Sequence, residues 1–403
     1  MHIVAFIIGT RPEAIKCAPL ILAMKKSNQM KPLVVSTGQH KEMLDVTLAV
    51  FGIKADIDLA VMRPRQTLTD VTQRILKSLF DVLNTSSIDA IIVHGDTATT
   101  LAGALYAFQQ RIPVLHVEAG LRSGNIVSPF PEEANRRLVA QISSLHLAPT
   151  PGNYLNLLRE GINPSQIFIT GNTVIDSLHW GIKNAKDYGV AGLEDLDSDQ
   201  RRIILASAHR RESWDYLTEI ADALYEISME ENVRIIVPLH KNPIVREKIM
   251  SRLQGKENIS LVEPLPYLGF CKLMKKCYLI ISDSSGAEEE GPTLGKPTLV
   301  LRELTERPEA VHLGTAKLVG RNRVNIVSET VALLNDNQLY SSMSRSINPY
   351  GDGNATNRTL HAIAMFLSNE KVLDETYNQI SSNEIFVPFR DTINTELSIS
   401  SIE

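Results

Sequence analysis

His2-Ile3-Val4-Ala5-Phe6-Ile7-Ile8 is followed directly by Gly9-Thr10-Arg11-Pro12-Glu13-Ala14-Ile15-Lys16. The continuous apolar run is typical of a parallel β-strand that is covered on both faces. Pro12 suits the first turn of a helix, and Glu13 is favoured at the same positive helix end. A strand that turns into a helix in this way points backbone N–H groups at the space above the turn. With Arg11 and Lys16 beside it, the turn is a candidate phosphate site. The alternative interpretation is a basic turn with two solvated charges.

Apolar or β-branched runs of the same kind recur between amphipathic stretches. They occupy residues 3–8, 32–36, 90–93, 114–117, 145–148 and 167–169, and then residues 202–206, 234–238, 260–262, 278–282 and 298–301. Such alternation predicts parallel α/β sheets. A length of 403 residues exceeds what one hydrophobic core usually supports. The sequence therefore predicts two doubly wound, Rossmann-like α/β domains.

The expected domains are residues 1–172 and 177–350, with a hinge near residues 170–180. In open α/β sheets, ligands bind at the carboxyl ends of the strands, so a cleft between the two domains is the expected ligand site. Residues 371–403 are polar and rich in Ser, Asn and Glu. We interpret this tail as an appendage or a partly disordered segment.

Composition excludes several function classes. A net charge of −5 argues against a general nucleic-acid-binding surface. The three cysteines have no metal-ligand spacing and imply no disulfide framework. No run approaches the ~18 apolar residues of a membrane span, and the first apolar run is too short for a signal peptide. We expect a cytoplasmic protein with no membrane partner.

Three acids of the first half follow expected strands or lie in a Pro-rich loop: Asp96, Glu118 and Glu132. Carboxylates that share a site can have their pKa values pushed apart for acid and base catalysis. Each alone fits equally well as a helix cap or as an ion-pair partner, for which the candidates are Arg122, Arg136 and Arg137. Together they favour a catalytic site.

Cations come from both halves, as a pyrophosphate held between two domains requires. The second half supplies His209, Arg210 and Arg211, and the turn at 284–286 opens a second helix with small residues. Glu290 stands one and a half turns beyond this point, where a carboxylate can accept hydrogen bonds from a ribose diol. The alternative is that the three consecutive acids at 288–290 are surface charges that compensate the helix dipole.

These motifs, in this order, resemble the non-hydrolysing UDP-N-acetylglucosamine 2-epimerases over about residues 1–367. The resemblance is carried by residues 9–16, 38–44, 94–97, 116–122, 131–136, 171–176, 209–213, 305–309 and 348–353. It implies a glycosyltransferase-B-like fold, a homodimer, and a C-terminal helix at about residues 355–367 that packs back on the first domain. It also implies reversible epimerisation at carbon 2 of UDP-N-acetylglucosamine, which supplies a precursor for bacterial cell-surface polysaccharide.

The resemblance assigns roles to individual positions. The catalytic positions are Asp96, Glu118, Glu132 and His209. The substrate-binding positions are Arg11, Lys16, Phe270 on the uracil, Ser284, Ser285 and Gly286 on the diphosphate, Glu290 on the ribose, and Arg307. Without the resemblance, Phe270 would be interpreted as a core aromatic residue.

Bacterial members of the family are activated by a second UDP-N-acetylglucosamine beside the active site. The matching positions are Gln39, Arg65, Gln66, Glu132, Arg210 and His240. Two departures from the family stand out. Glu42 replaces a Gln of some regulated members, which places a negative charge near a diphosphate. Ser285 replaces a Gly, and a side chain there is restricted if φ is positive.

Chemistry limits the mechanism independently of the resemblance. Carbon 2 is not next to a carbonyl carbon, so direct deprotonation would leave an unstabilised carbanion. Transient oxidation needs a nicotinamide, and the sequence holds no Gly-x-Gly-x-x-Gly fingerprint. Elimination of UDP to a glycal, followed by re-addition, avoids both problems and requires no cofactor and no metal. The alternatives are a glycosyltransferase, a hydrolysing 2-epimerase and a catalytically silent nucleotide-sugar sensor.

Overall fold

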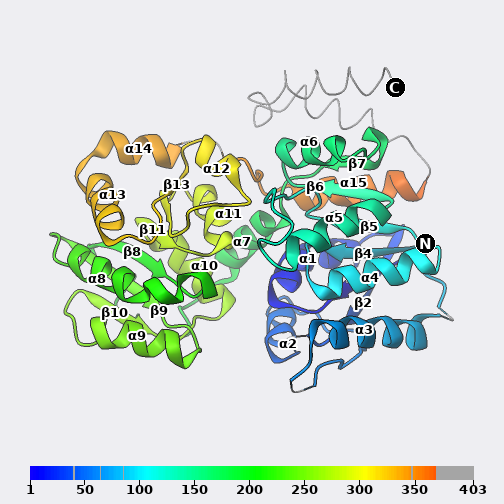
Figure 1. The fold of residues 1–403 in the computed structure, drawn as a ribbon, viewed down its shortest axis with the longest axis horizontal. Coiled ribbons are helices and arrows are strands. Elements are labelled where there is room, and N and C mark those ends of the chain that lie inside the picture. The colour runs from blue at the N-terminus through cyan, green and yellow to red at the C-terminus, as the bar shows by residue number, and fades with distance from the viewer. Residues whose placement is uncertain (40, 64, 85, 346–347, 369–403) are drawn as a thin grey trace. The chain divides into compact units, whose positions relative to one another are not determined.

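The computed structural model describes residues 1–39, 41–63, 65–84, 86–345 and 348–368 (Figure 1). The chain divides into two compact units. Unit 1 consists of Met1–Ser177 together with the segment that begins at Tyr350, and unit 2 is Leu178–Pro349. The tail at 371–403 lies outside the described residues.

The sheet of unit 1 has the strand order β3-β2-β1-β4-β5-β6-β7, and all neighbouring strands run parallel. The chain order reverses between β1 and β4, which is the place where doubly wound sheets bind ligands. The strands are β1 His2–Ile8, β2 Met30–Ser36, β3 Ile57–Asp58, β4 Ala90–His94, β5 Val114–Val117, β6 Leu145–Ala148 and β7 Ile167–Ile169.

Helices cover both faces of this sheet, because right-handed crossovers lead in opposite directions from β1 and from β4. On one face α3, α4 and α5 pack over an apolar core, and on the other α1 packs against α2 and α15. The helices are α1 Arg11–Met24, α2 Lys41–Val50, α3 Leu68–Leu83, α4 Ala98–Gln109, α5 Glu132–Ile142, α6 Pro151–Arg159, α7 Thr173–Asn184, which continues into unit 2, and α15 Ala355–Leu367.

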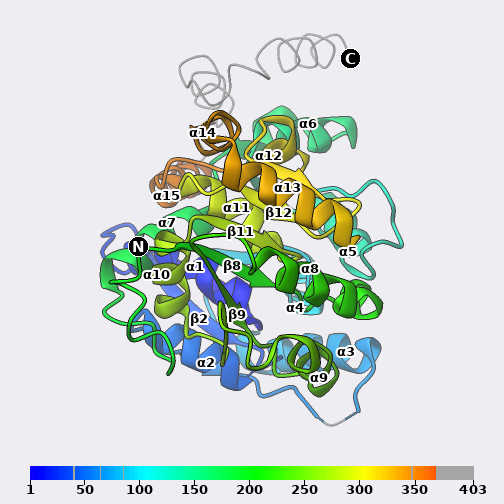
Figure 2. The same cartoon turned by 90° about the vertical axis from the view of Figure 1, so that its left-hand side faces the viewer.

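Unit 2 repeats the architecture with the strand order β10-β9-β8-β11-β12-β13, again all parallel. Along one face of its sheet, α13, α8 and α9 lie side by side (Figure 2). The strands are β8 Arg202–Ser207, β9 Val233–Pro238, β10 Ile259–Val262, β11 Leu279–Ser282, β12 Thr298–Val300 and β13 Ala316–Leu318. The helices are α8 Leu217–Ile227, α9 Pro243–Leu253, α10 Tyr267–Lys276, α11 Ser285–Thr293, α12 Pro308–His312, α13 Arg323–Asn335 and α14 Asn337–Arg345.

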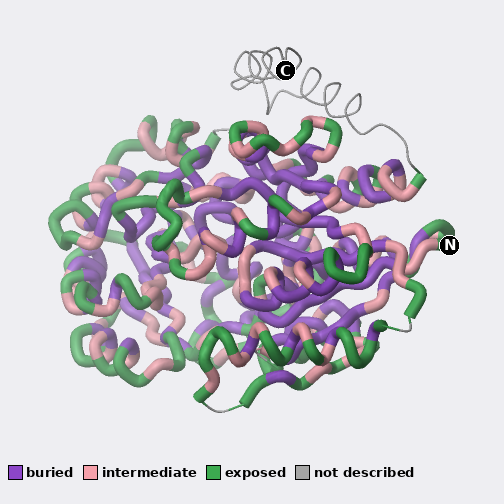
Figure 3. The backbone as a smooth tube through the Cα atoms, turned by 45° about the vertical axis from the view of Figure 1, so that its right-hand side comes forward, coloured by how far each residue is buried: buried purple, intermediate pink, exposed green. Residues whose placement is uncertain are grey.

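The prediction of two doubly wound parallel sheets is confirmed. All eleven predicted strands form within a residue or two of their predicted bounds, because each is a continuous apolar run and is buried along most of its length (Figure 3). The sequence analysis missed the edge strands β3 and β13. They contain only two and three residues, among them Asp58 and Lys317, so no apolar run marks them.

Two features are absent from the residues that the structure describes. No helix there is both long and apolar enough to cross a membrane. Nor is any group of three or more His, Cys, Asp or Glu side chains arranged there to hold a metal ion. The three cysteines, Cys17, Cys271 and Cys277, are buried, and none of them forms a disulfide.

Candidate active site

The turn between β1 and α1 leaves no room for a side chain at Gly9. A Cβ atom there would lie 2.3 Å from the hydroxyl oxygens of both Thr37 and Thr99, which are 2.9 Å from each other. The N–H groups of Gly9 and Thr10 donate hydrogen bonds of 2.6 and 2.9 Å to Oε2 of Glu13. Two of the N–H groups that were expected to face a phosphate therefore already bind a carboxylate of their own helix.

Glu13 is also tied to the next turn of the sheet. Its Oε1 accepts a 2.5 Å hydrogen bond from the hydroxyl of Thr97, the residue that precedes α4. Glu13 is 2% exposed. Burial raises its pKa from 4.5 to about 7, although the hydrogen bonds from Thr97, Gly9 and Thr10 favour the ionised form. A buried carboxyl that titrates near neutrality thus lies beside Asp96.

Register places Asp96 and Glu118 close together. His94 of β4 pairs with Val117 of β5, and the two acids follow these partners at the same edge of the sheet. Glu118 has a φ of +65°, a conformation that residues other than glycine rarely adopt. Strained backbone of this kind is concentrated at functional sites, because the surrounding structure must hold it.

The Glu118 carboxylate lies among Lys16, Asn172 and His94. Lys16 forms a buried ion pair with Oε1, and Asn172 donates a 3.1 Å hydrogen bond to the same oxygen. Nε2 of His94 lies 3.7 Å from Oε2. Lys16 and Glu118 are 9% and 8% exposed at their side chains, so water screens this pair little. The predicted phosphate ligand Lys16 and the predicted catalytic acid Glu118 are therefore in direct contact.

Asp96 is held by an arginine. Nε and Nη2 of Arg136 lie 2.8 and 2.7 Å from its Oδ2. Burial raises the pKa of Asp96, Arg136 opposes this rise, and the charges of Glu118 and Glu132 add to it. Oε2 of Glu132 is buried and has no hydrogen-bond partner among the described residues. The three predicted acids thus form one electrostatically coupled cluster.

Only one of the three arginines considered as partners pairs with these acids. Arg122 binds Glu160 with two hydrogen bonds of 2.7 and 2.6 Å. Arg137 lies 3.3 Å from Glu133. Neither Glu160 nor Glu133 was a predicted site residue. Arg11 is the first residue of α1 and is partly exposed.

In unit 2, His209 is surrounded by charged and aromatic groups. Its Nδ1 lies 3.3 Å from Oδ1 of Asp283, and its ring stacks on His240 with centroids 5.6 Å apart. Burial lowers the pKa of His209, Asp283 raises it, and His240 and Arg210 lower it further. The net effect favours the neutral ring in the structure without substrate.

The turn at residues 284–286 opens a helix as predicted, since Ser284 precedes α11 and Ser285 begins it. Neither Ser285 nor Gly286 has a positive φ, so the side chain of Ser285 causes no backbone strain. Phe270 of α10 is half-buried against the apolar cluster that includes Tyr188 and Leu273. Its aromatic ring therefore belongs at least partly to the core.

The three consecutive acids of α11 are not surface charges. Glu288, Glu289 and Glu290 are 0%, 1% and 7% exposed, so the alternative of a solvated acidic helix end is wrong. Glu289 accepts a 2.6 Å hydrogen bond from Arg307, and Glu288 lies 3.6 Å from Arg302. Arginines after β12 thus compensate the buried charges of Glu288 and Glu289.

Glu306 completes this charge network. It accepts hydrogen bonds of 3.0 Å from Arg302 and 2.7 Å from Arg307, and it lies 4.0 Å from Nη2 of Arg210. Burial alone would raise the pKa of Glu306, but the charges of Arg307, Arg302 and Arg210 hold it well below its usual range. The network links the predicted nucleotide contact Arg307 to Arg210.

The positions that the resemblance assigns to a second ligand are distributed over both units. In unit 1, Gln39 accepts a 2.9 Å hydrogen bond from Thr99, and Gln66 binds the backbone of Val61 and Arg63. Glu42 and Arg65 are exposed. In unit 2, Arg210 and His240 flank His209. Hydrogen bonds of the described residues do not join the unit 1 positions into one site.

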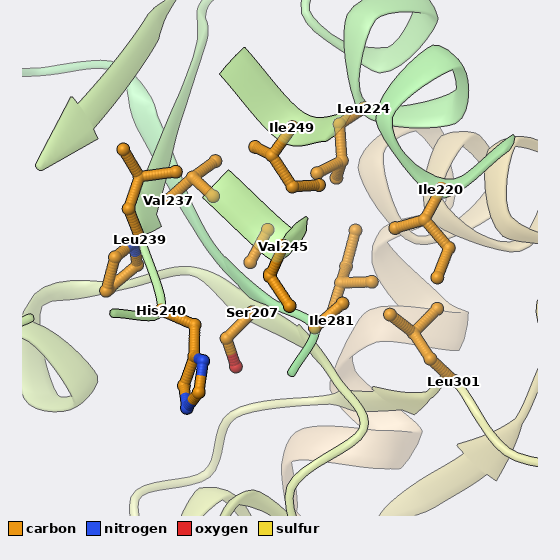
Figure 4. Close-up of a pocket in the computed structure, with 13 residues that line it drawn as sticks. Ser207, Ile220, Leu224, Val237, Leu239, His240, Val245, Ile249, Ile281 and Leu301 are labelled. Carbon is orange, nitrogen blue, oxygen red and sulfur yellow. The ribbon is translucent and has the colours of Figure 1, made fainter. Parts of the chain in front are cut away.

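A small cavity lies behind Ser207 and His240 (Figure 4). Its other labelled lining residues are apolar side chains of the sheet, α8 and α9: Ile220, Leu224, Val237, Leu239, Val245, Ile249, Ile281 and Leu301. The cavity has a volume of about 10 Å³, the space of a single water molecule. A cavity of this size is too small to hold a substrate.

The structure adds buried residues to the candidate site that the sequence analysis did not select: Glu13, Arg136, Asn172, Asp283, Arg302 and Glu306. Glu13 had a usable signal, because Thr10-x-x-Glu13 has the spacing of a capping box, and Arg136 was one of three candidate partners for the acids. Asn172 and Asp283 contact partners that are distant in sequence, whereas Arg302 and Glu306 bind each other four residues apart.

Comparison with known proteins places this architecture among nucleotide-sugar enzymes. The structure is similar to that of the UDP-N-acetylglucosamine 2-epimerase from Neisseria meningitidis bound to UDP-GlcNAc, with a TM-score of 0.83 and 44% identity over 90% of this chain and all of that chain. A crystal structure from Listeria monocytogenes gives a TM-score of 0.87 at 43% identity, covering 92% of this chain and 97% of the other.

Sequence comparison agrees. The family model for UDP-N-acetylglucosamine 2-epimerase matches residues 22–364. The UDP-N-acetylglucosamine 2-epimerase of Escherichia coli K12 is 47% identical over 365 residues, which cover 89% of this chain and 97% of that protein. The protein belongs to the UDP-N-acetylglucosamine 2-epimerase family, and it is an isomerase.

Proposed function

We propose that the protein interconverts UDP-N-acetylglucosamine and UDP-N-acetylmannosamine. The observation that carries the proposal is the acid cluster of unit 1, in which Asp96, Glu118 and Glu132 follow neighbouring strands or begin α5 and influence one another electrostatically. A glycosyltransferase needs one base and an acceptor site, whereas inversion of a C–H centre requires proton transfer on two faces. Several coupled acids favour the isomerase.

The proposed chemistry is elimination and re-addition. As the bond between carbon 1 and the diphosphate oxygen breaks, the electron pair leaves with UDP, and a carboxylate of the cluster takes the proton from carbon 2. The glycal formed in this way accepts a proton on the opposite face from a second acid while UDP re-adds at carbon 1. Burial, opposed by Arg136 and assisted by the charges of Glu118 and Glu132, raises the pKa of Asp96 above its ordinary value, which favours an acid that both takes and returns protons.

Both units contribute binding groups in this proposal. In unit 1, Arg11 and Lys16 stabilise the departing diphosphate together with His209 of unit 2. Ser284, Ser285 and Gly286 open α11 and bind the diphosphate through backbone N–H groups, as helix N-termini do. Glu290 binds the ribose, and Phe270 and Arg307 contact the nucleotide.

The Lys16–Glu118 ion pair has a role in the same scheme. A phosphate that approaches Lys16 competes with Glu118 for its charge, so substrate binding weakens the hold of Lys16 on that carboxylate. Loss of this partner raises the proton affinity of Glu118 at the moment when a proton acceptor is required. Binding of the leaving group and activation of the acid are thereby coupled.

The resemblance extends the proposal to the protein's biological setting. We propose that the enzyme is a cytoplasmic homodimer that supplies UDP-N-acetylmannosamine for polysaccharide synthesis. A second UDP-N-acetylglucosamine would activate it through Gln39, Glu42, Arg65, Gln66, Arg210 and His240. Because the activator is then the substrate itself, a titration of initial rate against UDP-N-acetylglucosamine should give a sigmoidal curve, and a hyperbolic curve would contradict this activation.

The test of the proposed function is proton NMR of UDP-N-acetylglucosamine incubated with the purified protein in deuterated water. We expect the manno epimer, deuterium at carbon 2 of both sugars, and no accumulation of free UDP. Free UDP with free N-acetylmannosamine would indicate a hydrolysing epimerase instead. An unchanged nucleotide sugar would refute the isomerase, and epimerisation without deuterium would refute proton exchange with solvent.

A further inference from the structure

Asp283 is completely buried, and its side chain contacts the loop that carries His209 and Arg210. Its Oδ2 accepts hydrogen bonds of 2.9 Å from the backbone N–H groups of both His209 and Arg210. Its Oδ1 lies 3.3 Å from Nδ1 of His209 and has no hydrogen-bond partner among the described residues. One oxygen therefore holds the backbone of the loop, and the other faces the imidazole.

The sheet determines this arrangement. Ser282 of β11 pairs in register with Ser207 of β8, and their hydroxyl oxygens are 2.8 Å apart. Asp283 and the loop that carries His209 follow these two partners at the same edge of the sheet. Two adjacent parallel strands thus deliver a carboxylate and a histidine to each other, with no flexible segment between the strand end and Asp283.

A buried carboxylate oxygen is rarely left without a donor, because its desolvation costs free energy. For Oδ1 of Asp283, the nearest donor is Nδ1 of His209 when that nitrogen carries a proton. The ring is only partly exposed, so its remaining nitrogen, Nε2, is the one left for a ligand. His240 stacks on the ring, and its own Nδ1 accepts a 3.2 Å hydrogen bond from the N–H of Asn242.

We propose that Asp283 is a positioning residue that keeps Nδ1 of His209 protonated and stabilises the charged ring when Nε2 faces the diphosphate. The inference rests on the proposed function only for the identity of the anion. When His209 gains its second proton, at Nε2, the positive ring lies between the Asp283 carboxylate and the phosphate oxygens. The uncharged state of the free enzyme and the charged state of the complex then share one ring orientation.

Asp283→Asn tests the proposal sharply. The two backbone N–H groups require an oxygen at the Oδ2 position, so the amide oxygen of the variant takes that place and its NH₂ group faces Nδ1. Nδ1 must then accept a hydrogen bond, and the proton of the neutral ring moves to Nε2. The substitution therefore reverses the tautomer of His209 without a change in side-chain shape.

The first measurement is ¹⁵N NMR of the full-length protein with labelled histidines, with His209 assigned by comparison with His209→Gln. We expect Nδ1–H in the native protein and Nε2–H in Asp283→Asn. Asp336→Asn is the matched control, because Asp336 also accepts two backbone N–H groups, from Gln338 and Leu339. The same tautomer in the native protein and in Asp283→Asn would overturn the proposal.

The second measurement is the pH titration of His209 in the same samples. The charged groups that face it are Asp283, Arg210 and His240, and only the first is changed. We expect the pKa of His209 to fall by about one unit or more in Asp283→Asn, as expected for loss of a neighbouring opposite charge. Added UDP should raise this pKa in the native protein and raise it less in the variant. An unchanged pKa in Asp283→Asn would contradict the proposal.

The third measurement separates a positioning role from a general structural one. Asp283→Asn should lower turnover by about 100-fold, in the range for loss of a positioned acid–base group. When His209 is already replaced by Gln, adding Asp283→Asn should lower turnover little further, because Asp283 acts on the reaction through the imidazole of His209. An equal loss in both backgrounds would refute action through His209. The two NMR measurements require no substrate turnover, so they remain decisive if the proposed reaction proves wrong.

Discussion

The hydroxyl of Thr97 donates a 2.5 Å hydrogen bond to Oε1 of Glu13, and this single contact joins the turn before α4 to the turn before α1. The other oxygen of Glu13 binds the N–H groups of Gly9 and Thr10. One carboxylate thus connects the segment that carries Arg11 to the segment that carries Asp96. The spacing between the proposed phosphate ligands and the proposed acid depends on it.

Glu13→Gln should change how stability depends on pH. The folded-state pKa of Glu13 is raised from 4.5 to about 7, so between these values the folded state holds a proton that the unfolded state has lost. The stability of the native protein therefore falls as pH rises through this window. The amide cannot ionise. Its oxygen can accept from the N–H groups of Gly9 and Thr10, and its NH₂ group can donate to the hydroxyl of Thr97 in place of accepting from it. The free energy of unfolding of the variant relative to the native protein should rise by about 3 kcal/mol between pH 5 and pH 8.

Urea unfolding at the two pH values, followed by circular dichroism, measures this difference. All other titrating groups are common to both proteins and cancel. A relative stability that stays constant from pH 5 to pH 8 would show that Glu13 is ionised throughout.

Lys16→Met should destabilise the protein through its partner. Glu118 would remain buried without this cation, and removal of one member of a buried ion pair costs about 3–5 kcal/mol. Lys16→Met combined with Glu118→Gln should cost clearly less than the sum of the two single changes. Urea unfolding of the four proteins gives the coupling energy.

Lys41→Met is the matched control for this cycle. Lys41 pairs with Asp58, but both side chains are exposed to solvent, so the loss should be below about 1 kcal/mol. Additive effects of Lys16 and Glu118 would contradict the buried ion pair.

The sequence predicted the two sheets because continuous apolar runs are a local signal. It also predicted which residues follow the strands, since parallel strands bring their carboxyl ends to one edge. Asp96 and Glu118 could therefore be selected before the structure was known. Arg136 could be named only as one of three candidate partners, and the contact of Lys16 with Glu118 could not be predicted, because these contacts join residues 40 and 102 positions apart.

The charge network of unit 2 could be predicted from the sequence even less well. Glu288 to Glu290 have the composition of a solvated helix end, yet they are buried, and arginines after β12 pair with Glu288 and Glu289. Whether an acidic run faces water or an arginine depends on tertiary packing, which local sequence does not encode. The role of Asp283 could not be predicted for a related reason. Its partners are backbone N–H groups of a loop 73 and 74 residues away.

Asp96→Asn should lower the rate of epimerisation by ~100-fold or more if the carboxylate carries a proton in the reaction. The substitution keeps the shape of the side chain and one acceptor for Arg136, so the fold should be retained. Proton NMR of the nucleotide-sugar pool measures the rate. Near-normal turnover would remove Asp96 from the catalytic groups.

Glu160→Gln is the matched control for Asp96→Asn. Glu160 is also paired with an arginine, Arg122, and the two acids are exposed to a similar extent, 24% and 22%. It lies outside the acid cluster, so its substitution should change turnover less than about twofold, the effect of a loss below 0.5 kcal/mol. A similar loss in both variants would show that broken arginine pairs, rather than lost proton transfer, slow the enzyme.

Glu306→Gln should destabilise unit 2. The relative stability of this variant should fall as pH rises, whereas that of Glu13→Gln should rise. Glu306 is 5% exposed and faces Arg302 and Arg307. A neutral amide would remove one of the carboxylates that compensate these buried cations, at a cost of about 3–5 kcal/mol at pH 7. Because the folded-state pKa of Glu306 is lowered, its contribution is present above the unfolded pKa of about 4.3. That contribution is lost as pH falls below this value.

Urea unfolding of the native protein and Glu306→Gln at pH 7 and at pH 3.5 tests this expectation, with a stability difference that shrinks at the lower pH. Glu212→Gln serves as control, since Glu212 binds the same Arg302 at 3.1 Å but is 44% exposed. Its loss should stay below about 1 kcal/mol at either pH. If Glu306→Gln were as mild as Glu212→Gln, the arginines would be neutralised by Glu288 and Glu289 alone, and Glu306 would have no part in holding Arg307 in place.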